Sequence, residues 1–578
     1  MNHTAYSLLR RVHRSFDWIT EGLLCFGLLF SPWAFGTTEP WSIRVMNTVA
    51  FALGGLWLLK LCIRLIGYHP LQWPETSREG AGSRGRNGGN GDHETFNSHL
   101  PATTLEPRIP AIERSASNPH PSALAFQPTA SLLQEPLGEH APSTSRTPQT
   151  TTRPHRSSSS HRGARKRLKR ERHFTWLLAA TTIYVLAYCL VSAWNARAIY
   201  HPQSWSFEYR KIIPWLPHSY DQAASWSAFW KYLGLAGFFW SLRDWLLTLS
   251  PGESALFRDG ELSRSRLPAR LRRLFWLLAI NGTVLAVEGL FQRVDGGNKL
   301  LWLVQPRFDT SATSQFGPWA YRSNAGQYFN LLWPALLGFW WALVSSGGRR
   351  DLLSSLHERQ AAKLLPCVAL MAICPLVCSS RGTAIVLIMN VILAGGILWM
   401  AQWRKPWRRK APILAVLAGA IVGGALLGWR TLAPRMEMIQ EGYHAREELY
   451  ITGRYMARDN QEFGSGPGTL ETLYQLYRPS EQDEWLAYMH NDYLETLITF
   501  GWFGLLPIFF LLFLTFTHWF VCPGIPANKY FLMLLWASLG GCLLHSYFDF
   551  PFQVHSVLTL FLVLCAVLSC LSCRTAAS

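Results

Sequence analysis

The sequence predicts an all-α polytopic membrane protein with about twelve transmembrane helices. Several apolar runs approach the roughly 20 residues that a helix needs to cross a bilayer. The chain has 27 tryptophans, whose amphipathic rings favour the two water–lipid interfaces. Lys and Arg concentrate in short loops between the apolar runs, where they set the orientation of membrane helices. Together these three observations define the fold class.

The whole chain is less hydrophobic than expected for a protein with about twelve membrane helices. Mean hydropathy is only +0.07, because a long polar segment dilutes the average. The formal net charge of +18 is explained by the basic loops, so it does not indicate a nucleic-acid partner. The 11 cysteines lie mostly inside apolar runs, which is typical of small packing residues. Neither a phosphate-binding loop nor a dinucleotide fingerprint occurs in the sequence.

Residues 1–66 form the first membrane segment. The apolar run Trp18–Phe35 follows a basic start, and a second run, Val45–Ile66, comes almost at once. Because the two runs are adjacent and no convincing cleavage site separates them, we expect two membrane helices rather than a signal peptide.

Residues 67–173 form a polar insert rich in Pro, Ser, Thr, Gly and Asn. Such a segment cannot bury enough apolar surface to offset the entropy of ordering, so we expect it to be disordered in the cytoplasm. Its polybasic end, Arg162–Arg172, adjoins the next apolar run. There it either stops translocation or binds anionic lipid headgroups.

Ten further apolar runs follow the insert, and they define the rest of the domain organisation. Residues 174–316 hold membrane helices three to five, 317–551 the next six with a large loop, and 552–578 the last helix and a cytoplasmic tail. The runs begin near Phe174, Ser225, Leu274, Ala325, Leu364, Thr383, Ala411, Asn491, Phe531 and Val554.

The basic loops alternate along the chain so that both termini and the insert are predicted in the cytoplasm. This threading places four polar stretches on the opposite side: 195–223, 294–324, Ser379–Gly382 and 429–489. The last is the largest, lies between the ninth and tenth helices, and is expected to contain short helices.

Two polar side chains on that side suit group-transfer chemistry. Arg381 lies in the very short link between two apolar runs, where a charge costs about 2.5 kcal/mol or more at depth and normally has a partner or a function. The fork of an arginine suits bidentate contact with phosphate. His490 precedes the tenth predicted helix, and an imidazole there suits a general base that takes a proton from a hydroxyl.

Several short motifs occur in order between about Gly317 and Pro551. They are Arg322-Ser-Asn-Ala-Gly326, Ser380-Arg-Gly382, Arg446 eighteen residues before Gly464-Ser-Gly-Pro-Gly468, His490-Asn491-x9-Gly501-x-x-Gly504, and His545 followed by Asp549-Phe-Pro551. Near the N-terminus Ser31-Pro-Trp-Ala-Phe-Gly36 precedes them. In this order and spacing the chain resembles the O-antigen ligase/polymerase family of integral membrane glycosyltransferases.

The resemblance implies a GT-C-like fold and assigns roles to individual residues. In that family two arginines and one histidine bind an undecaprenyl-linked sugar and deprotonate the acceptor; by motif these are Arg381, Arg446 and His490. The motifs also imply further substrate-binding residues, which are Arg322, Asn324, Asn491, His545 and Asp549. The insert has no counterpart in the family core.

The expected reaction is transfer of a glycan from undecaprenyl pyrophosphate to an acceptor hydroxyl at the periplasmic face of a bacterial inner membrane. We expect inversion at the anomeric carbon, and no metal or other cofactor. The expected partners are the lipid-linked donor, membrane lipids and an acceptor. That acceptor is open: lipid A-core indicates a ligase, a growing glycan a polymerase, and a protein hydroxyl an O-oligosaccharyltransferase.

Two alternatives come from other classes. A membrane transporter or lipid flippase fits twelve helices with intramembrane charge, but no internal repeat is visible. A zinc-dependent hydrolase would use residues that lack H-E-x-x-H or comparable spacing, namely His490, Asp492, His545, Asp549 and His555.

Overall fold

The computed structural model describes residues 3–67, 70, 157–258, 267–306, 309–345, 361–404, 406–478, 487–521 and 528–572. The chain divides into two units by its internal contacts: Met1–Ser83 with Gly163–Ser578, and Arg84–Arg162. The second unit lies almost entirely outside the described residues, as does most of the polar insert 67–173. The predicted disorder of that insert therefore stays a prediction.

Helices account for most of the described chain. The N-terminal part contains α1 (His3–Trp33), η1 (Phe35–Thr37), α2 (Pro40–Leu65), α4 (Ser157–Trp194), α5 (Gln222–Leu247), α6 (Pro251–Arg258) and α7 (Ala269–Asp295). The C-terminal part contains α8 (Arg322–Ser345), α10 (Leu364–Val377), α11 (Arg381–Ala401), α12 (Trp407–Glu437), α13 (Ile439–Asp459), α14 (Leu470–Tyr477), α15 (Asp492–Val521), α16 (Lys529–His545) and α17 (His555–Ser572).

Each of the twelve predicted membrane runs corresponds to a helix. Eight of the described helices are long and apolar enough to cross a membrane: α2, α4, α7, α8, α11, α12, α15 and α17. Helices α10 and α16 are apolar but shorter, with 14 and 17 residues, and α1 and α5 are not among the eight. The all-α polytopic membrane fold is confirmed, while the number of twelve spans stays a prediction.

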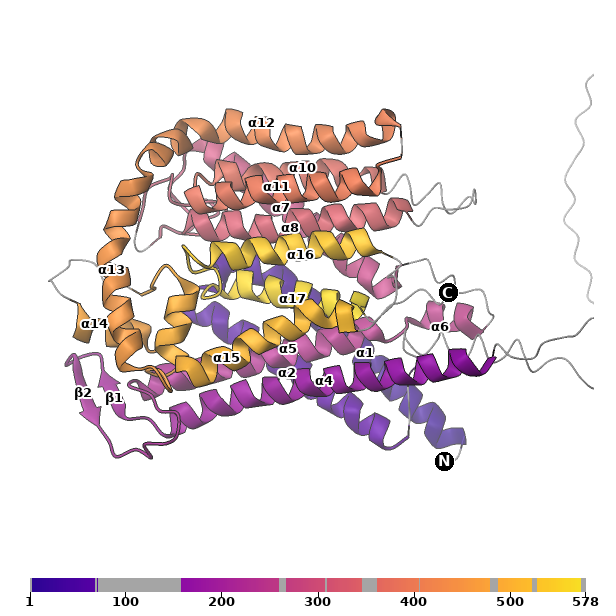
Figure 1. Ribbon diagram of the computed structural model, residues 1–578, viewed down its shortest axis with the longest axis horizontal. Coiled ribbons are helices and arrows are strands. Elements are labelled where there is room, and N and C mark those ends of the chain that lie inside the picture. The colour runs from indigo at the N-terminus through magenta and orange to yellow at the C-terminus, as the bar shows by residue number, and fades with distance from the viewer. Residues whose placement is uncertain are drawn as a thin grey trace, which may run out of the picture. The chain divides into compact units, whose positions relative to one another are not determined.

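The long helices lie side by side, and α8 is at their centre (Figure 1). It packs against α7, α10, α11, α16 and α17 and is buried along almost its whole length. At one end of the bundle α13 lies across the ends of the long helices, with α14 and the β-hairpin beside it. The short helix α6 lies at the other end. The polar segments predicted to share one side of the membrane thus share one end of the bundle.

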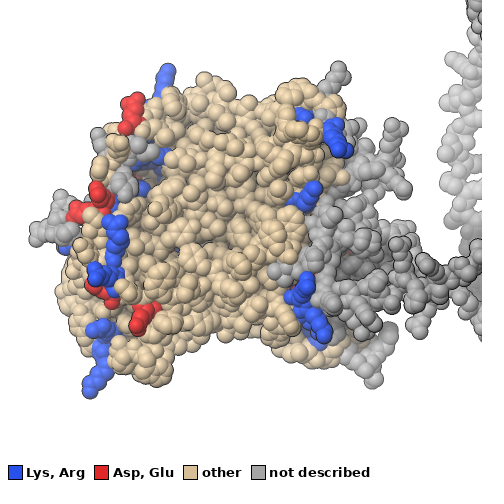
Figure 2. Space-filling view, viewed as in Figure 1, with Lys and Arg blue, Asp and Glu red and all other residues tan. Residues whose placement is uncertain are grey.

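Charged side chains follow the same division. On the face shown in Figure 2, Lys, Arg, Asp and Glu lie at the two ends, and the broad belt between them is uncharged. Large apolar side chains are exposed on the helices of the belt, among them Ile392, Leu426, Phe510 and Phe513. An uncharged belt between two charged rims is the surface that a bilayer requires. The chain is a multi-pass membrane protein.

The structure adds three features to the predicted helices. Helix α4 begins at Ser157, before the predicted start near Phe174, and α12 continues to Glu437, beyond the predicted start of the 429–489 stretch. That stretch, expected to contain short helices, contains the 8-residue α14 and also α13, which is longer, with 21 residues. Between α4 and α5 two strands, β1 (Ala198–His201) and β2 (Ser206–Tyr209), pair antiparallel; the sequence did not predict this hairpin.

Candidate active site

His490 immediately precedes α15, and its placement follows from the residues on both sides. The Asn491 side-chain oxygen accepts hydrogen bonds from the backbone N–H groups of Tyr493 (3.1 Å) and Leu494 (3.0 Å). This is an N-cap, which satisfies donors that the first helical turn leaves open. The His490 backbone has a φ of 51°, and its carbonyl accepts a hydrogen bond from the Tyr450 hydroxyl of α13 at 3.0 Å.

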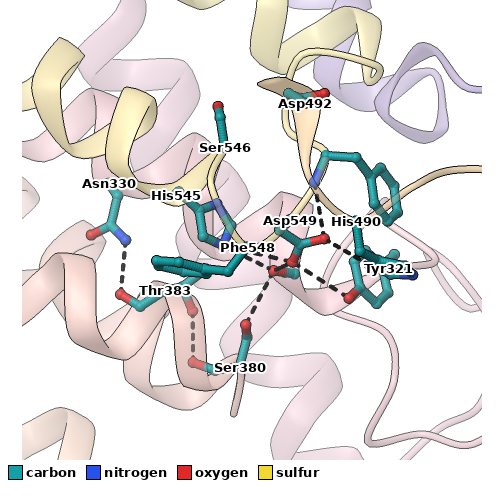
Figure 3. A network of polar contacts seen from close by, with 12 residues as sticks. Tyr321, Asn330, Ser380, Thr383, His490, Asp492, His545, Ser546, Phe548 and Asp549 are labelled. Carbon is teal, nitrogen blue, oxygen red and sulfur yellow. Dashed lines mark hydrogen bonds and ion pairs between the residues drawn. The ribbon is translucent and has the colours of Figure 1, made fainter. Parts of the chain in front are cut away.

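The His490 ring faces Asp549, which lies in the link between α16 and α17 (Figure 3). The distance between His490 Nδ1 and Asp549 Oδ1 is 3.3 Å. The Phe550 backbone N–H also donates to that oxygen, at 3.0 Å. Residues that lie 59 positions apart in the sequence thus form one pair.

The second Asp549 oxygen receives hydrogen bonds from the α8 side. The Ser323 hydroxyl donates to Oδ2, and the Tyr321 hydroxyl donates to it at 3.4 Å. The His545 Nε2 atom lies 3.2 Å from Ser323 Oγ and 3.6 Å from the same carboxylate oxygen. Figure 3 shows Asp549 at the centre of these contacts.

These contacts define the protonation of the pair. Burial would raise the pKa of Asp549, but the hydrogen bond from His490, the charges of His545 and His490 and the bond from Ser323 lower it well below its usual range. An ionised carboxylate only accepts hydrogen bonds, so His490 Nδ1 carries the proton. The lone pair of a neutral His490 ring is then on Nε2, which makes no hydrogen bond within the described part of the chain.

The turn that carries Arg381 connects to the same network. The Ser380 hydroxyl donates to Ser323 Oγ at 3.1 Å. Ser323 therefore accepts hydrogen bonds from Ser380 and His545 and donates one to Asp549. Ser323 and Ser380 were not predicted as site residues, although each adjoins a predicted arginine in the sequence.

Arg381 and Arg446 reach this region from different helices. Arg381 Nη1 donates to the Met438 carbonyl at 2.8 Å and to the Arg435 carbonyl at 3.4 Å, at the junction of α12 and α13. Arg446 Nη1 donates to the Phe548 carbonyl at 2.9 Å, next to Asp549. Each carbonyl contact uses only part of the fork of five N–H donors. The charge of Arg381 interacts with those of Arg446 and Arg435.

The electrostatic surroundings of Arg446 keep it charged. Burial lowers the pKa of the Arg446 guanidinium, but Tyr321, Asp549 and Tyr450 together raise it above its usual value. A permanently charged arginine beside the His490–Asp549 pair is suited to an anionic ligand. Arg435 was not singled out in the sequence, because it lies where an apolar run merges into polar residues without a motif.

Other predicted site residues have local partners. Arg322 Nη1 donates to the Thr313 carbonyl and to Ser314 Oγ, both at 3.0 Å, so this arginine holds the loop before α8. Asn324 is buried on α8, and its side-chain oxygen has no hydrogen-bond partner among the residues that the structure describes. That these two residues and Asn491 bind substrate stays a prediction.

The glycine-rich loop contacts α15 at Gly501, the first glycine of the motif that begins at His490. Helix α15 is broken at Gly501, whose φ is 57° and ψ −171°, a combination that only glycine adopts readily. At the break the Ser465 N–H donates to the Ile498 carbonyl (2.8 Å) and the Gly466 N–H to the Thr499 carbonyl (3.0 Å). The loop thereby satisfies carbonyls of α15 next to the break.

The residues of the zinc alternative do not all meet. Asp492 Oδ2 accepts a hydrogen bond from the Phe552 N–H at 3.0 Å, and His555 Nδ1 lies 3.1 Å from the Thr559 hydroxyl on its own helix. Within the described ranges no group of three or more His, Cys, Asp or Glu side chains is arranged to hold a metal ion.

Comparison with known proteins places these observations in a family. Residues 366–509 match the family model described as O-antigen ligase; the segment includes Arg381, Arg446 and His490. No curated protein and no solved structure matches the chain. The matched segment thus carries the two arginines and the histidine of the site, and the predicted resemblance to the O-antigen ligase/polymerase family is confirmed over residues 366–509.

Proposed function

We propose that the protein transfers a glycan from undecaprenyl pyrophosphate to an acceptor hydroxyl at the periplasmic face of a bacterial inner membrane. The family match supports a function of the O-antigen ligase/polymerase type. The observation that carries the finer proposal is the His490–Asp549 pair at 3.3 Å beside Arg446 and the Arg381 turn.

His490 is the general base of the proposed reaction. With Nδ1–H bound to Asp549, the imidazole presents its Nε2 lone pair to the acceptor hydroxyl. Asp549 orients the ring and stabilises the imidazolium that forms when His490 takes the proton, as a carboxylate does behind a catalytic histidine. Asp549 is therefore a positioning residue.

Arg381 and Arg446 hold the pyrophosphate of the donor. Their forks suit bidentate contact with phosphate oxygens, and they stabilise the negative charge of the leaving group. The acceptor oxygen forms a bond to the anomeric carbon as the bond between that carbon and the phosphate oxygen breaks. The electron pair leaves with undecaprenyl pyrophosphate, and the acceptor proton goes to His490. Attack opposite the leaving group inverts the anomeric carbon.

The transporter alternative receives less support from this arrangement. A transporter binds its substrate near the middle of the bilayer, at the interface of repeats. The arginines and the His490–Asp549 pair instead gather where the long helices meet α13, at one end of the bundle.

Transfer measured with purified protein in nanodiscs tests the proposal. The donor is a synthetic undecaprenyl-pyrophosphate glycan, offered alone to detect polymerisation and together with lipid A-core to detect ligation. We expect His490→Ala to lower turnover about 10²–10⁴-fold, the usual contribution of a positioned base, while donor binding persists. Arg381→Lys and Arg446→Lys should weaken donor binding, because lysine keeps the charge but loses the fork.

Two exposed residues of α13 provide matched controls. His444→Ala and Arg454→Lys change the same residue types away from the site and should leave transfer and donor binding intact. Normal turnover in a folded His490→Ala protein would remove the histidine from the mechanism. Absence of transfer to either acceptor by a folded wild-type protein that does not bind the donor would contradict the proposal as a whole.

A further inference from the structure

Phe550 connects two tyrosines at the site. Its ring centroid lies 5.3 Å from that of Tyr321, with the planes 8° apart, and 4.4 Å from that of Tyr488, with the planes 17° apart. His490 contacts the same phenylalanine edge-on, at 4.8 Å and 72°. The proposed base therefore shares one aromatic neighbour with both tyrosines.

The two tyrosines differ in their surroundings. Tyr321 donates a hydrogen bond to Asp549 and interacts with Arg446 and Arg381, the arginines assigned to the donor phosphates. Tyr488 interacts with the carboxyl groups of Glu495, Glu471 and Asp492. With the donor phosphates assigned to the arginines near Tyr321, the Tyr488 surface is left for the acceptor.

Tyr488 offers a surface suited to a sugar. Its side chain is 37% exposed even though Phe550 stacks on it. An aromatic face carries negative charge density, and the C–H groups on one face of a pyranose are polarised positively by the ring oxygens. Burial, and then the charges of Glu495 and Glu471, raise the pKa of Tyr488 to about 12. Its hydroxyl therefore stays protonated and can hydrogen-bond a sugar hydroxyl.

We infer that Tyr488 is a stacking platform for a sugar ring of the acceptor, two residues from the base that deprotonates that sugar. The inference rests on the proposed function, because it takes His490 as the base. It narrows the acceptor to one that presents a sugar ring, which is a growing glycan or lipid A-core rather than a protein hydroxyl.

Sugar binding measured without donor tests the platform directly. The full-length protein is solubilised in detergent, and saturation-transfer NMR measures the binding of maltotriose. We expect wild type to bind this sugar. Tyr488→Ala should weaken maltotriose binding about tenfold, within the range expected for loss of one stacked ring. Tyr488→Leu, which keeps volume without a π face, should weaken it similarly, and Tyr488→Phe should retain most of it.

A control and a second assay separate the possible failures. Tyr455→Ala removes a tyrosine of α13 that is 60% exposed and should not affect maltotriose binding. In the transfer assay Tyr488→Ala should raise the acceptor KM with little change in donor binding. Transfer and maltotriose binding that are both insensitive to Tyr488→Ala and Tyr488→Leu would overturn the platform and leave the proposed function. Tyr488-dependent sugar binding without any transfer would support the sugar site and contradict the proposed function.

Discussion

His490 combines an unfavourable backbone conformation with a well-defined side chain. A φ of 51° costs a residue with a β-carbon about 1–3 kcal/mol. The Asn491 cap, worth about 1 kcal/mol, and the Tyr450 hydrogen bond to the His490 carbonyl offset that cost. The strained backbone directs the ring toward Asp549, which is consistent with a functional rather than a purely structural histidine.

Asp549 gives a prediction about pH. Its pKa in the folded protein is below the ordinary value of 3.8. A group with a depressed pKa stabilises the folded state fully above the unfolded pKa, and the effect is lost as pH falls through the folded pKa. We expect Asp549→Asn to lower Tm in nanodiscs by the same amount at pH 7 and pH 5, and the gap to wild type to narrow only below about pH 4.

An exposed carboxylate serves as the control for this measurement. Glu462→Gln changes a side chain at the surface and should leave Tm nearly unchanged over the same range, as most surface substitutions do. A Tm difference for Asp549→Asn that disappears already between pH 7 and pH 5 would show that the carboxylate is not held ionised as the contacts indicate.

Single residues were predictable where their chemistry was conspicuous. A charged Arg381 in a very short membrane link and a histidine in a recognisable motif stand out in an apolar chain. The role of Asn491 was harder to predict, because an asparagine beside a histidine can either bind a ligand or cap a helix. In the structure its side-chain oxygen caps α15. Ser323 was not predicted, since its role depends on Asp549 arriving from a segment more than 200 positions away.

At the scale of elements, the broken helix α15 begins beside His490 and contacts the glycine-rich loop at its break. Besides the bonds from Ser465 and Gly466, the Trp502 N–H donates to the Gln461 carbonyl at 2.8 Å and the Phe503 N–H to the Glu462 carbonyl at 3.1 Å. From α4, the Tyr188 hydroxyl contacts the Phe463 and Phe500 carbonyls. The backbone groups at the break in α15 are therefore bonded to the glycine-rich loop and to α4.

Gly501→Ala should destabilise the protein because no β-carbon fits there. A β-carbon at this position would lie 2.3 Å from the Glu462 carbonyl oxygen and 2.5 Å from the Gly464 nitrogen. Backbone atoms cannot yield as a flexible side chain does, and the φ/ψ region alone costs about 1–3 kcal/mol. We expect a Tm several degrees lower than that of wild type in detergent, and reduced transfer, because the start of α15 moves.

Gly396→Ala is the comparison for that substitution. Gly396 lies inside α11, and a β-carbon there would meet nothing within 4 Å. Alanine is favoured over glycine in a helix by roughly 1 kcal/mol, so Tm should stay the same or rise. Equal Tm values for Gly501→Ala and Gly396→Ala would contradict the account of the break.

The helices themselves were predictable from apolar runs, but their ends were not. Helix α12 leaves the apolar region and continues through Arg430 and Arg435 to Glu437, because nothing in the sequence stops a helix where a bilayer ends. The β1–β2 hairpin has only four residues in each strand, and the polar stretch 195–223 shows no strand periodicity that would reveal it. Both features arise from packing at the end of the bundle rather than from a local pattern.

For the whole molecule, the two ends of the helix bundle differ in the partners of their charged side chains. At the end away from α13, Asp17 pairs with Lys60 at 2.7 Å and with Arg270 at 2.8 Å, and Arg64 pairs with Asp244 at 2.6 Å. Near α13, Arg381 and Arg446 donate hydrogen bonds to backbone carbonyls, and the Asp549 carboxylate acts on Arg446 through its charge. Direct ion pairs suit a structural role, whereas guanidinium groups bound to carbonyls keep part of their fork for an anionic ligand.

The distribution of Lys and Arg among the loops gives a prediction about orientation in the membrane. The loops predicted to be cytoplasmic are rich in Lys and Arg, so the end with α6 should face the cytoplasm and the end with α13 the periplasm. A cysteine introduced at Ser204, in the turn of the exposed hairpin, should react with a membrane-impermeant maleimide in intact spheroplasts. Gly252→Cys in α6 should react only after permeabilisation, with both compared to the parent protein because Cys62 is itself exposed. Labelling of Gly252→Cys but not Ser204→Cys in intact spheroplasts would invert the molecule, and a periplasmic glycan transfer at the His490–Asp549 pair would then be impossible.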